Sequence, residues 1–209
     1  MENYAPYISE VMSPEARADH LHTIAHEVGS ILLSNEIPFR VWSGTQAAEL
    51  GGHRYSQDVD MWLPDWAIRP AHECLRRFTD HEISVQEEFD RTIVTVGENA
   101  EVELMANMDI YTIDGVFPFR LTGRVLYQDA PPATDKWSIP FAPPEDTMLL
   151  KAVLQRDASI GKHDGEDIQA MASNMQGIDE AYLLRRLQAT KSIKRAVPFL
   201  RANGVTVDA

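Results

Sequence analysis

Apolar and polar positions follow a helical period at the two ends of the chain and a strand period in the middle. Residues 13–34 place apolar side chains at helical spacing, which predicts an amphipathic helix. These side chains are Leu21, Ile24, Val28, Ile31 and Leu32. Ser13-Pro14 starts this segment as helix N-termini commonly start, because a serine hydroxyl can accept a hydrogen bond from the first turn.

Short β-type runs occupy the middle of the chain, separated by glycine, proline and asparagine. The pattern predicts strands at 39–42, 57–63, 83–89, 92–97 and 100–106 and edge strands at 124–127 and 137–141. We expect turns at Ser43-Gly44-Thr45, at Pro64-Asp65 and over 113–116. Two shorter helices, at 46–50 and 70–78, are predicted between the strands.

Helical periodicity returns after the Pro143-Pro144 pair. It predicts helices at 147–157, 163–175, 179–190 and 192–203. We therefore expect an α/β (α+β) protein with a small mixed β-sheet and packed helices. The predicted domains are a core over residues 1–142 and an α-helical C-terminal subdomain over residues 143–209.

The stretch from Phe39 to Leu63 carries the candidate chemistry. Asp58 and Asp60 stand two positions apart on one predicted strand, so both carboxylates point to the same face. Two like charges repel each other there, whereas a divalent cation such as Mg²⁺ binds hard oxygen ligands of this kind. The preceding Gly44-Thr45 offers backbone N–H groups and a hydroxyl to a phosphate. The alternative is an exposed acidic strand end, and we prefer the metal-site hypothesis.

Composition and charge restrict the partners. The chain has no apolar run long enough to cross a bilayer, and its single cysteine, Cys74, excludes an intramolecular disulfide, so we expect a cytoplasmic protein without a membrane partner. The net charge of −13 is uneven, because Ala181–Val207 holds six basic residues and no acidic one. We expect this basic segment to dock on the acidic body, and binding to a polyanion such as RNA is the alternative.

Two sequence blocks resemble the nucleotidyltransferase superfamily of DNA polymerase beta. The first is Ser43-Gly44-Thr45 followed by Arg54–Met61, which fits the superfamily signature of a glycine turn, a spacer and Asp-x-Asp between apolar residues. Within the superfamily, the block looks most like the abortive-infection (AbiEii-type) toxin nucleotidyltransferases and related uncharacterised proteins. It departs from their pattern at Ser43, where glycine is common.

The resemblance implies a third acid on a strand beside the Asp-x-Asp strand. Residues 100–106 offer Glu101 and Glu103, which share one strand face. We expect Glu103 to complete the catalytic and metal-binding set with Asp58 and Asp60, because apolar residues flank it on both sides. Glu101 follows a turn, so we expect it at a fraying strand end in contact with water.

The second block lies in the first two C-terminal helices. Its residues are Pro144-Glu145-Asp146, Lys151, Arg156, Lys162, Asp164 and Asp167. By resemblance, Lys151 reaches the nucleotide phosphates, and Asp164 and Asp167 hold this segment in place or touch the substrate. The alternative is a charged helix pair with solvent-exposed ion pairs. The full set expected to bind the nucleotide is Ser43, Gly44, Thr45, Arg54, Ser56 and Lys151.

The activity that the resemblance implies is transfer of NMP from an NTP to an acceptor hydroxyl, with Mg²⁺ or Mn²⁺ as cofactor. The acceptor would be an RNA such as tRNA, or a protein, and the enzyme could be the toxin of a pair with a cognate antitoxin. A small-molecule (antibiotic) nucleotidyltransferase is one alternative. The other is a non-catalytic nucleotide-binding or antitoxin-like module, which the retained carboxylates argue against.

Overall fold

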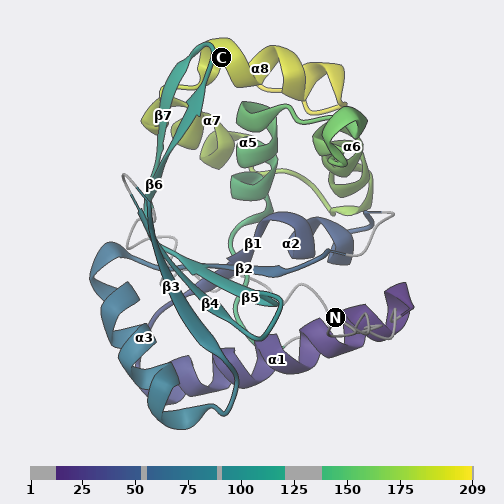
Figure 1. Cartoon of the computed structure of the whole chain (residues 1–209). Helices are drawn as coiled ribbons and strands as arrows, with labels where there is room; N and C mark the ends of the chain where they lie inside the picture. Colours follow the sequence, from purple (N-terminus) through teal and green to yellow (C-terminus); the bar gives the residue numbers. More distant parts are fainter. Residues whose placement is uncertain (1–12, 53–55, 89–90, 121–137, 209) are drawn as a thin grey trace, which may run out of the picture.

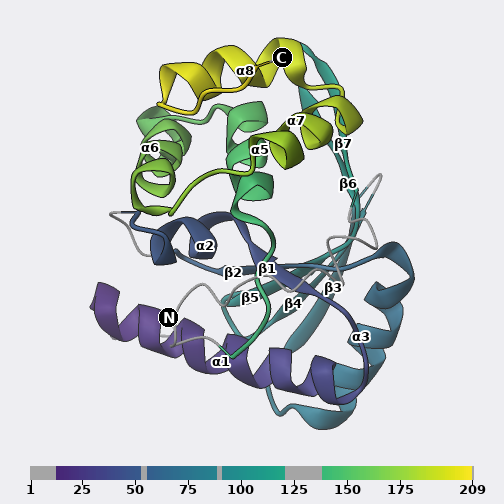
Figure 2. The same cartoon turned by 180° about the vertical axis from the view of Figure 1, so that it is seen from behind.

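The fold is a mixed β-sheet with helices on both faces and a helical C-terminal part (Figures 1 and 2). The structure is a computed structural model, and it describes residues 13–52, 56–88, 91–120 and 138–208. The sheet has five strands in the order β1-β2-β5-β4-β3. Strands β2 and β5 are parallel, and the other neighbouring pairs are antiparallel. The α/β class predicted from the sequence is confirmed.

The bounds of the elements are as follows. The sheet consists of β1 (Arg40–Trp42), β2 (Val59–Trp62), β3 (Ile83–Glu88), β4 (Arg91–Val96) and β5 (Val102–Met105). A separate hairpin consists of β6 (Met108–Thr112) and β7 (Gly115–Phe119). The helices are α1 (Pro14–Ser34), α2 (Ser43–Glu49), α3 (Asp65–Phe78), α5 (Pro144–Leu154), α6 (Asp164–Asn174), α7 (Glu180–Ala189) and α8 (Ile193–Ala202), with a short 3-10 helix η1 (Ala158–Ile160).

Two hydrophobic cores lie on the two faces of the sheet. Helices α1 and α3 cover one face, and α2 with the C-terminal helices covers the other (Figures 1 and 2). Because side chains alternate along β2, Val59 and Met61 pack into the first core, on the side of α1 and α3, and Trp62 packs into the second core, on the side of the C-terminal helices. Asp60 therefore faces the C-terminal helices, because it shares a face with Trp62.

The long helices form where the periodicity predicts them. Helix α1 is capped by Ser13, whose Oγ accepts a hydrogen bond from the Ala16 backbone N–H at 3.2 Å. The second core joins Trp62 to Met148 and Leu183, so apolar packing crosses position 142. The domain boundary at that position stays a prediction.

Several local predictions are wrong. Ser43-Gly44-Thr45 is the first turn of α2 and not a separate turn, because the helix continues back to the end of β1. Helix α3 begins directly at Asp65 and runs through Pro70, since Ala67, Ile68 and Ala71 bury one continuous face. Only the tight turn of the β6–β7 hairpin was predicted, and its strands were missed.

The predicted edge strands fare differently. The one at 124–127 and Trp137 lie outside the described residues. Residues 138–141 of the second predicted edge strand are described, and among them Phe141 makes an isolated parallel bridge with Val41. The described residues contain no helix with the length and apolar content needed to span a membrane.

The basic segment Ala181–Val207 is partly anchored to the acidic body. The buried Arg186 donates from Nε to the Asp146 carboxylate at 2.6 Å, and Arg195 forms an ion pair with Asp114 at the tip of the hairpin. Other basic residues of the segment, including Lys191 and Lys194, are exposed. These ion pairs support docking of the segment onto the body.

Candidate active site

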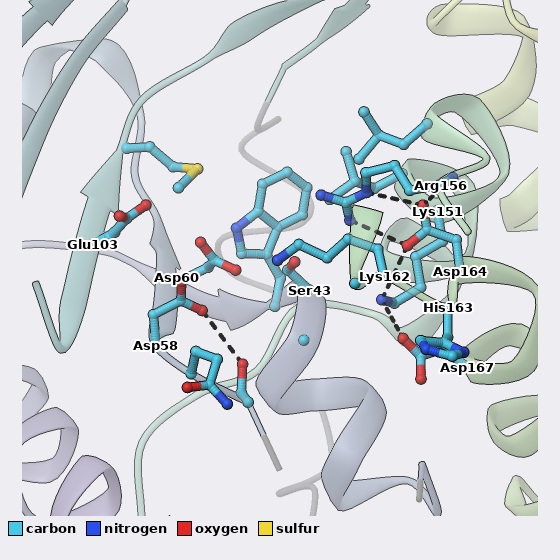
Figure 3. A pocket seen from close by; sticks show the side chains of 18 of the residues that line it. Ser43, Asp58, Asp60, Glu103, Lys151, Arg156, Lys162, His163, Asp164 and Asp167 are labelled. Carbon is cyan, nitrogen blue, oxygen red and sulfur yellow. Dashed lines mark hydrogen bonds and ion pairs between the residues drawn. The ribbon is translucent and has the colours of Figure 1, made fainter. Parts of the chain in front are cut away.

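A pocket of about 780 Å³ lies between the sheet and the C-terminal helices (Figure 3). Asp58, Asp60 and Glu103 line it from the sheet side. Charged residues from α5, α6 and the loop between them line the opposite side. They are Lys151, Arg156, Lys162, His163, Asp164 and Asp167. Two segments that resemble conserved nucleotidyltransferase blocks are therefore brought together around one cavity.

The carboxylates of the pocket are held by two parallel strands. Asp60 of β2 stands directly beside Glu103 of β5 in the strand register. Neighbouring strands lie about 4.8 Å apart, so these side chains leave the sheet at the same level. Asp58 precedes Asp60 by two positions and lines the same pocket.

The electrostatics of Asp60 reflect this crowding. Burial, together with the charges of Asp58 and Glu103, raises the pKa of its carboxyl from 3.8 to about 7. A hydrogen bond from the Ser43 side chain and the charge of Lys151 act in the opposite direction. At neutral pH the pocket therefore lacks enough positive charge to keep Asp60 fully ionised.

The donor set suits a hard divalent cation, because its oxygens are carboxylates and Asp60 lacks a sufficient counter-charge. In the part of the chain that the structure describes, no group of three His, Cys, Asp or Glu side chains is arranged to hold a metal ion. Asp58, Asp60 and Glu103 thus offer the oxygen ligands that such a metal prefers, and they line the same side of the pocket. Convergence of the carboxylates on one point is not part of this conformation.

Glu101 does not meet water, contrary to the prediction. The residue is only 3% exposed, and its carboxylate accepts hydrogen bonds from the backbone and side-chain nitrogens of Asn99 at 3.0 and 3.2 Å. Burial works in the opposite direction, but the bonds from Asn99 lower the pKa of Glu101. It is absent from the lining of the pocket, whereas Glu103 is present. The preference for Glu103 stays a prediction, although the reason given for excluding Glu101 is wrong.

Ser43 holds a special backbone position at the start of α2. Its φ of 62° lies in the left-handed region, which favours glycine. The Ser43 N–H donates to Thr147 Oγ1 at 2.9 Å, and the Thr147 hydroxyl donates to Gln46 Oε1 at 2.5 Å. These contacts fix the backbone of Ser43, whose side chain forms a hydrogen bond with Asp60.

The other residues of the first block divide between the pocket and the support behind it. Gly44 and Ser56 line the pocket and lie close together, because a Cβ on Gly44 would come within 2.7 Å of Ser56 Oγ. Thr45 is buried and is not among the residues that line the pocket. Its hydroxyl donates to the Asp58 carbonyl at 3.0 Å, which holds the backbone directly before β2. Arg54 lies outside the described residues.

A buried ion network forms the helical wall. Lys151 Nζ donates to Asp167 Oδ2 at 2.7 Å and lies 3.6 Å from Asp164 Oδ1 (Figure 3). Arg156 donates to both oxygens of Asp164 from Nε and Nη2, at 3.0 and 3.1 Å. Lys151 and Asp164 are 3% and 1% exposed, so the alternative of solvent-exposed ion pairs does not describe these two residues.

Sequence reasoning missed an apolar part of the pocket. It consists of Trp42, Met105, Met108, Ile110, Leu150 and Leu154. Alternation along β5 could have indicated Met105, which is two residues after Glu103 and shares its strand face. Met108 and Ile110 come from the hairpin, whose strands were not predicted, so no sequence signal placed them here.

The fold is that of solved nucleotidyltransferase structures. A crystal structure of ANT(2″)-Ia in complex with adenylyl-2″-tobramycin matches with a TM-score of 0.54 and 10% identity over 84% of this chain and 99% of that chain. A solution structure of the antibiotic-resistance factor ANT(2″)-Ia matches with a TM-score of 0.57 and 10% identity, over 88% and 98%. No protein-family model and no curated protein sequence matches the chain. At this identity the likeness establishes the fold.

Proposed function

We propose that the protein is a metal-dependent nucleotidyltransferase that moves NMP from an NTP to an acceptor hydroxyl. One observation carries the proposal: Asp60 and Glu103 on adjacent parallel strands, with Asp58 directly before the first of them, line a single pocket, and Asp60 has a raised pKa. Like charges that line one pocket destabilise a fold, and a ligand of opposite charge explains their placement. The fold of the ANT(2″)-Ia structures supports this function.

Each residue has a role in this scheme. Asp58, Asp60 and Glu103 would hold Mg²⁺ or Mn²⁺, and the bound metal would offset charge on the phosphate oxygens. The acceptor oxygen bonds to the α-phosphorus, the bond between the α-phosphorus and its bridging oxygen to the β-phosphate breaks, and pyrophosphate leaves. Glu103 accepts the proton of the acceptor hydroxyl on its carboxylate. Ser43 and Gly44, which line the pocket at the start of α2, would contact the phosphates.

Labelled nucleotides test this function. The protein is incubated with Mg²⁺ and an NTP labelled at the α-phosphate or at the γ-phosphate, with candidate acceptors. Nucleotidyl transfer leaves the α-label on the acceptor and releases the γ-label in pyrophosphate. An acceptor that keeps the γ-label would instead identify a kinase and refute the proposal.

The charge of the pocket favours a cationic small molecule as acceptor. Its described lining holds six carboxylate side chains against three lysine and arginine side chains. Mg²⁺ offsets only part of the charge of an NTP, so an incoming acceptor still meets excess negative charge. RNA would be repelled there, whereas an amino sugar of the kind bound in the ANT(2″)-Ia complex would be attracted.

The acceptor experiment compares aminoglycosides with total RNA and total protein under the same labelling conditions. Label on an aminoglycoside is the expected result. Label on RNA or protein would favour the acceptors that the sequence resemblance implies, and with them a toxin that has a cognate antitoxin.

A further inference from the structure

The positive charges of the pocket are unequally available. Among the described lining residues they belong to Lys151, Arg156 and Lys162. Lys151 is committed to Asp167 and Asp164, and Arg156 is committed to both oxygens of Asp164. The side chain of Lys162 has no ion pair or hydrogen bond with any described residue. An incoming anion can therefore bind the Lys162 side chain without breaking an ion pair or hydrogen bond to any residue that the structure describes.

Lys162 is also placed to meet such an anion. It is exposed, in contrast to Lys151, which is only 3% exposed. Its side chain points away from Asp164 and Asp167 and towards the side of the pocket that holds Ser43 and Asp60 (Figure 3). A ligand that extends from the carboxylates across the pocket would reach the amine.

The loop that carries Lys162 has a defined backbone. The Lys162 N–H donates to the Asp157 carbonyl at 3.1 Å, and Gly161 before it has a φ of 70°, which favours glycine. Asp164 on the other side accepts a hydrogen bond from the Arg156 N–H at 2.8 Å. The ion network thus fixes both ends of the loop, and only the side chain of Lys162 needs to be ordered on binding.

We propose that Lys162 is the residue that binds the terminal phosphates of the NTP, an inference that rests on the proposed function. In the proposed function the carboxylates at the opposite wall would hold the metal, and a triphosphate bound there would have its terminal phosphates within reach of Lys162 across the pocket. A free ammonium group there forms charge-assisted hydrogen bonds with phosphate oxygens. Lys151, which the sequence suggested for this role, is a positioning residue that holds Asp164 and Asp167.

The test compares binding of a triphosphate with binding of a monophosphate. Calorimetry with Mg²⁺ measures the affinity of the full chain for a non-hydrolysable ATP analogue, its α,β-methylene form, and for AMP. Lys162→Met is compared with Lys162→Arg and with Lys194→Met, which removes an exposed lysine outside the pocket. We expect Lys162→Met to weaken binding of the analogue about tenfold and to change AMP affinity less than about twofold. Lys162→Arg should retain most of the affinity.

The outcomes separate this inference from the function it rests on. If Lys162→Met and Lys194→Met bind the analogue equally well, the phosphate role of Lys162 is refuted while nucleotide binding stands. An equal loss for AMP and for the analogue would also refute it, because contact with the terminal phosphates affects only the triphosphate. If the unmodified protein binds neither ligand, the proposed function itself fails and the inference fails with it.

Discussion

At the scale of single residues, Asp60 lies among carboxylates whose charges disfavour its own ionisation. Its folded pKa of about 7 exceeds the ordinary value of 3.8, so the folded state holds a proton that the unfolded state releases between these pH values. Stability from this group is therefore present at low pH and is lost as the pH rises through about 7. A bound cation reverses this effect by stabilising the ionised form.

The substitution Asp60→Asn tests whether the ionised Asp60 carboxylate destabilises the folded state. Without metal, the variant should exceed the unmodified protein in free energy of unfolding by on the order of 2 kcal/mol at pH 8, and the difference should shrink towards pH 4. Urea unfolding in EDTA across this pH range measures it. Asp80→Asn, at an exposed position, serves as the control. A variant that is less stable than the unmodified protein at pH 8 would show that the ionised Asp60 is a structural group.

The two glutamates near β5 should respond in opposite ways. Glu103→Gln should reduce nucleotidyl transfer by orders of magnitude, because the acceptor proton loses its carboxylate, while NTP binding is retained. Glu101→Gln should leave transfer nearly unchanged and cost about 1 kcal/mol of stability, because its buried bonds to Asn99 weaken. Transfer rates and thermal unfolding of both variants provide the measurement. The reverse pattern would place the third carboxylate at Glu101.

At the scale of elements, the α5–α6 connection depends on a buried charge balance. Lys151 on α5 forms ion pairs with both Asp164 and Asp167 on α6, and all three residues line the pocket. The helices themselves were predictable from periodicity. The ion network was not, because residue spacing does not show which charged faces turn inwards.

Lys151→Met should therefore destabilise the fold as a whole. The substitution leaves Asp167 without its cation and Asp164 with Arg156 alone, and removing one partner of a buried ion pair typically costs about 3–5 kcal/mol. The midpoint of denaturant unfolding should fall clearly for this variant and should stay unchanged for Lys162→Met, whose amine pairs with no described residue. Equal midpoints for the two variants would mean that the Lys151 contacts contribute little to stability.

At the scale of the whole molecule, the sequence predicted the α/β class and the main helices because local periodicity governs them. It placed Asp58, Asp60 and Glu103 near one another because strand alternation and family resemblance agree on them. The apolar wall depends on a hairpin that folds against α5, and the buried state of Glu101 depends on Asn99 turning back over it. The spacing of apolar and polar residues shows neither the packing of the hairpin nor the hydrogen bonds within this turn. The domain boundary at 142 and the roles of the pocket residues remain predictions.

The metal-dependent binding of a nucleotide is the most direct test of the central claim. Thermal unfolding is followed with each of the four common NTPs, in Mg²⁺ and in EDTA, for the unmodified protein and for Asp58→Asn. We expect at least one NTP to raise the melting temperature only when Mg²⁺ is present, and we expect Asp58→Asn to abolish that rise while remaining folded. A melting temperature that no nucleotide changes in the presence of Mg²⁺, or an equal rise in the variant, would contradict the assignment of these carboxylates to a metal–nucleotide site.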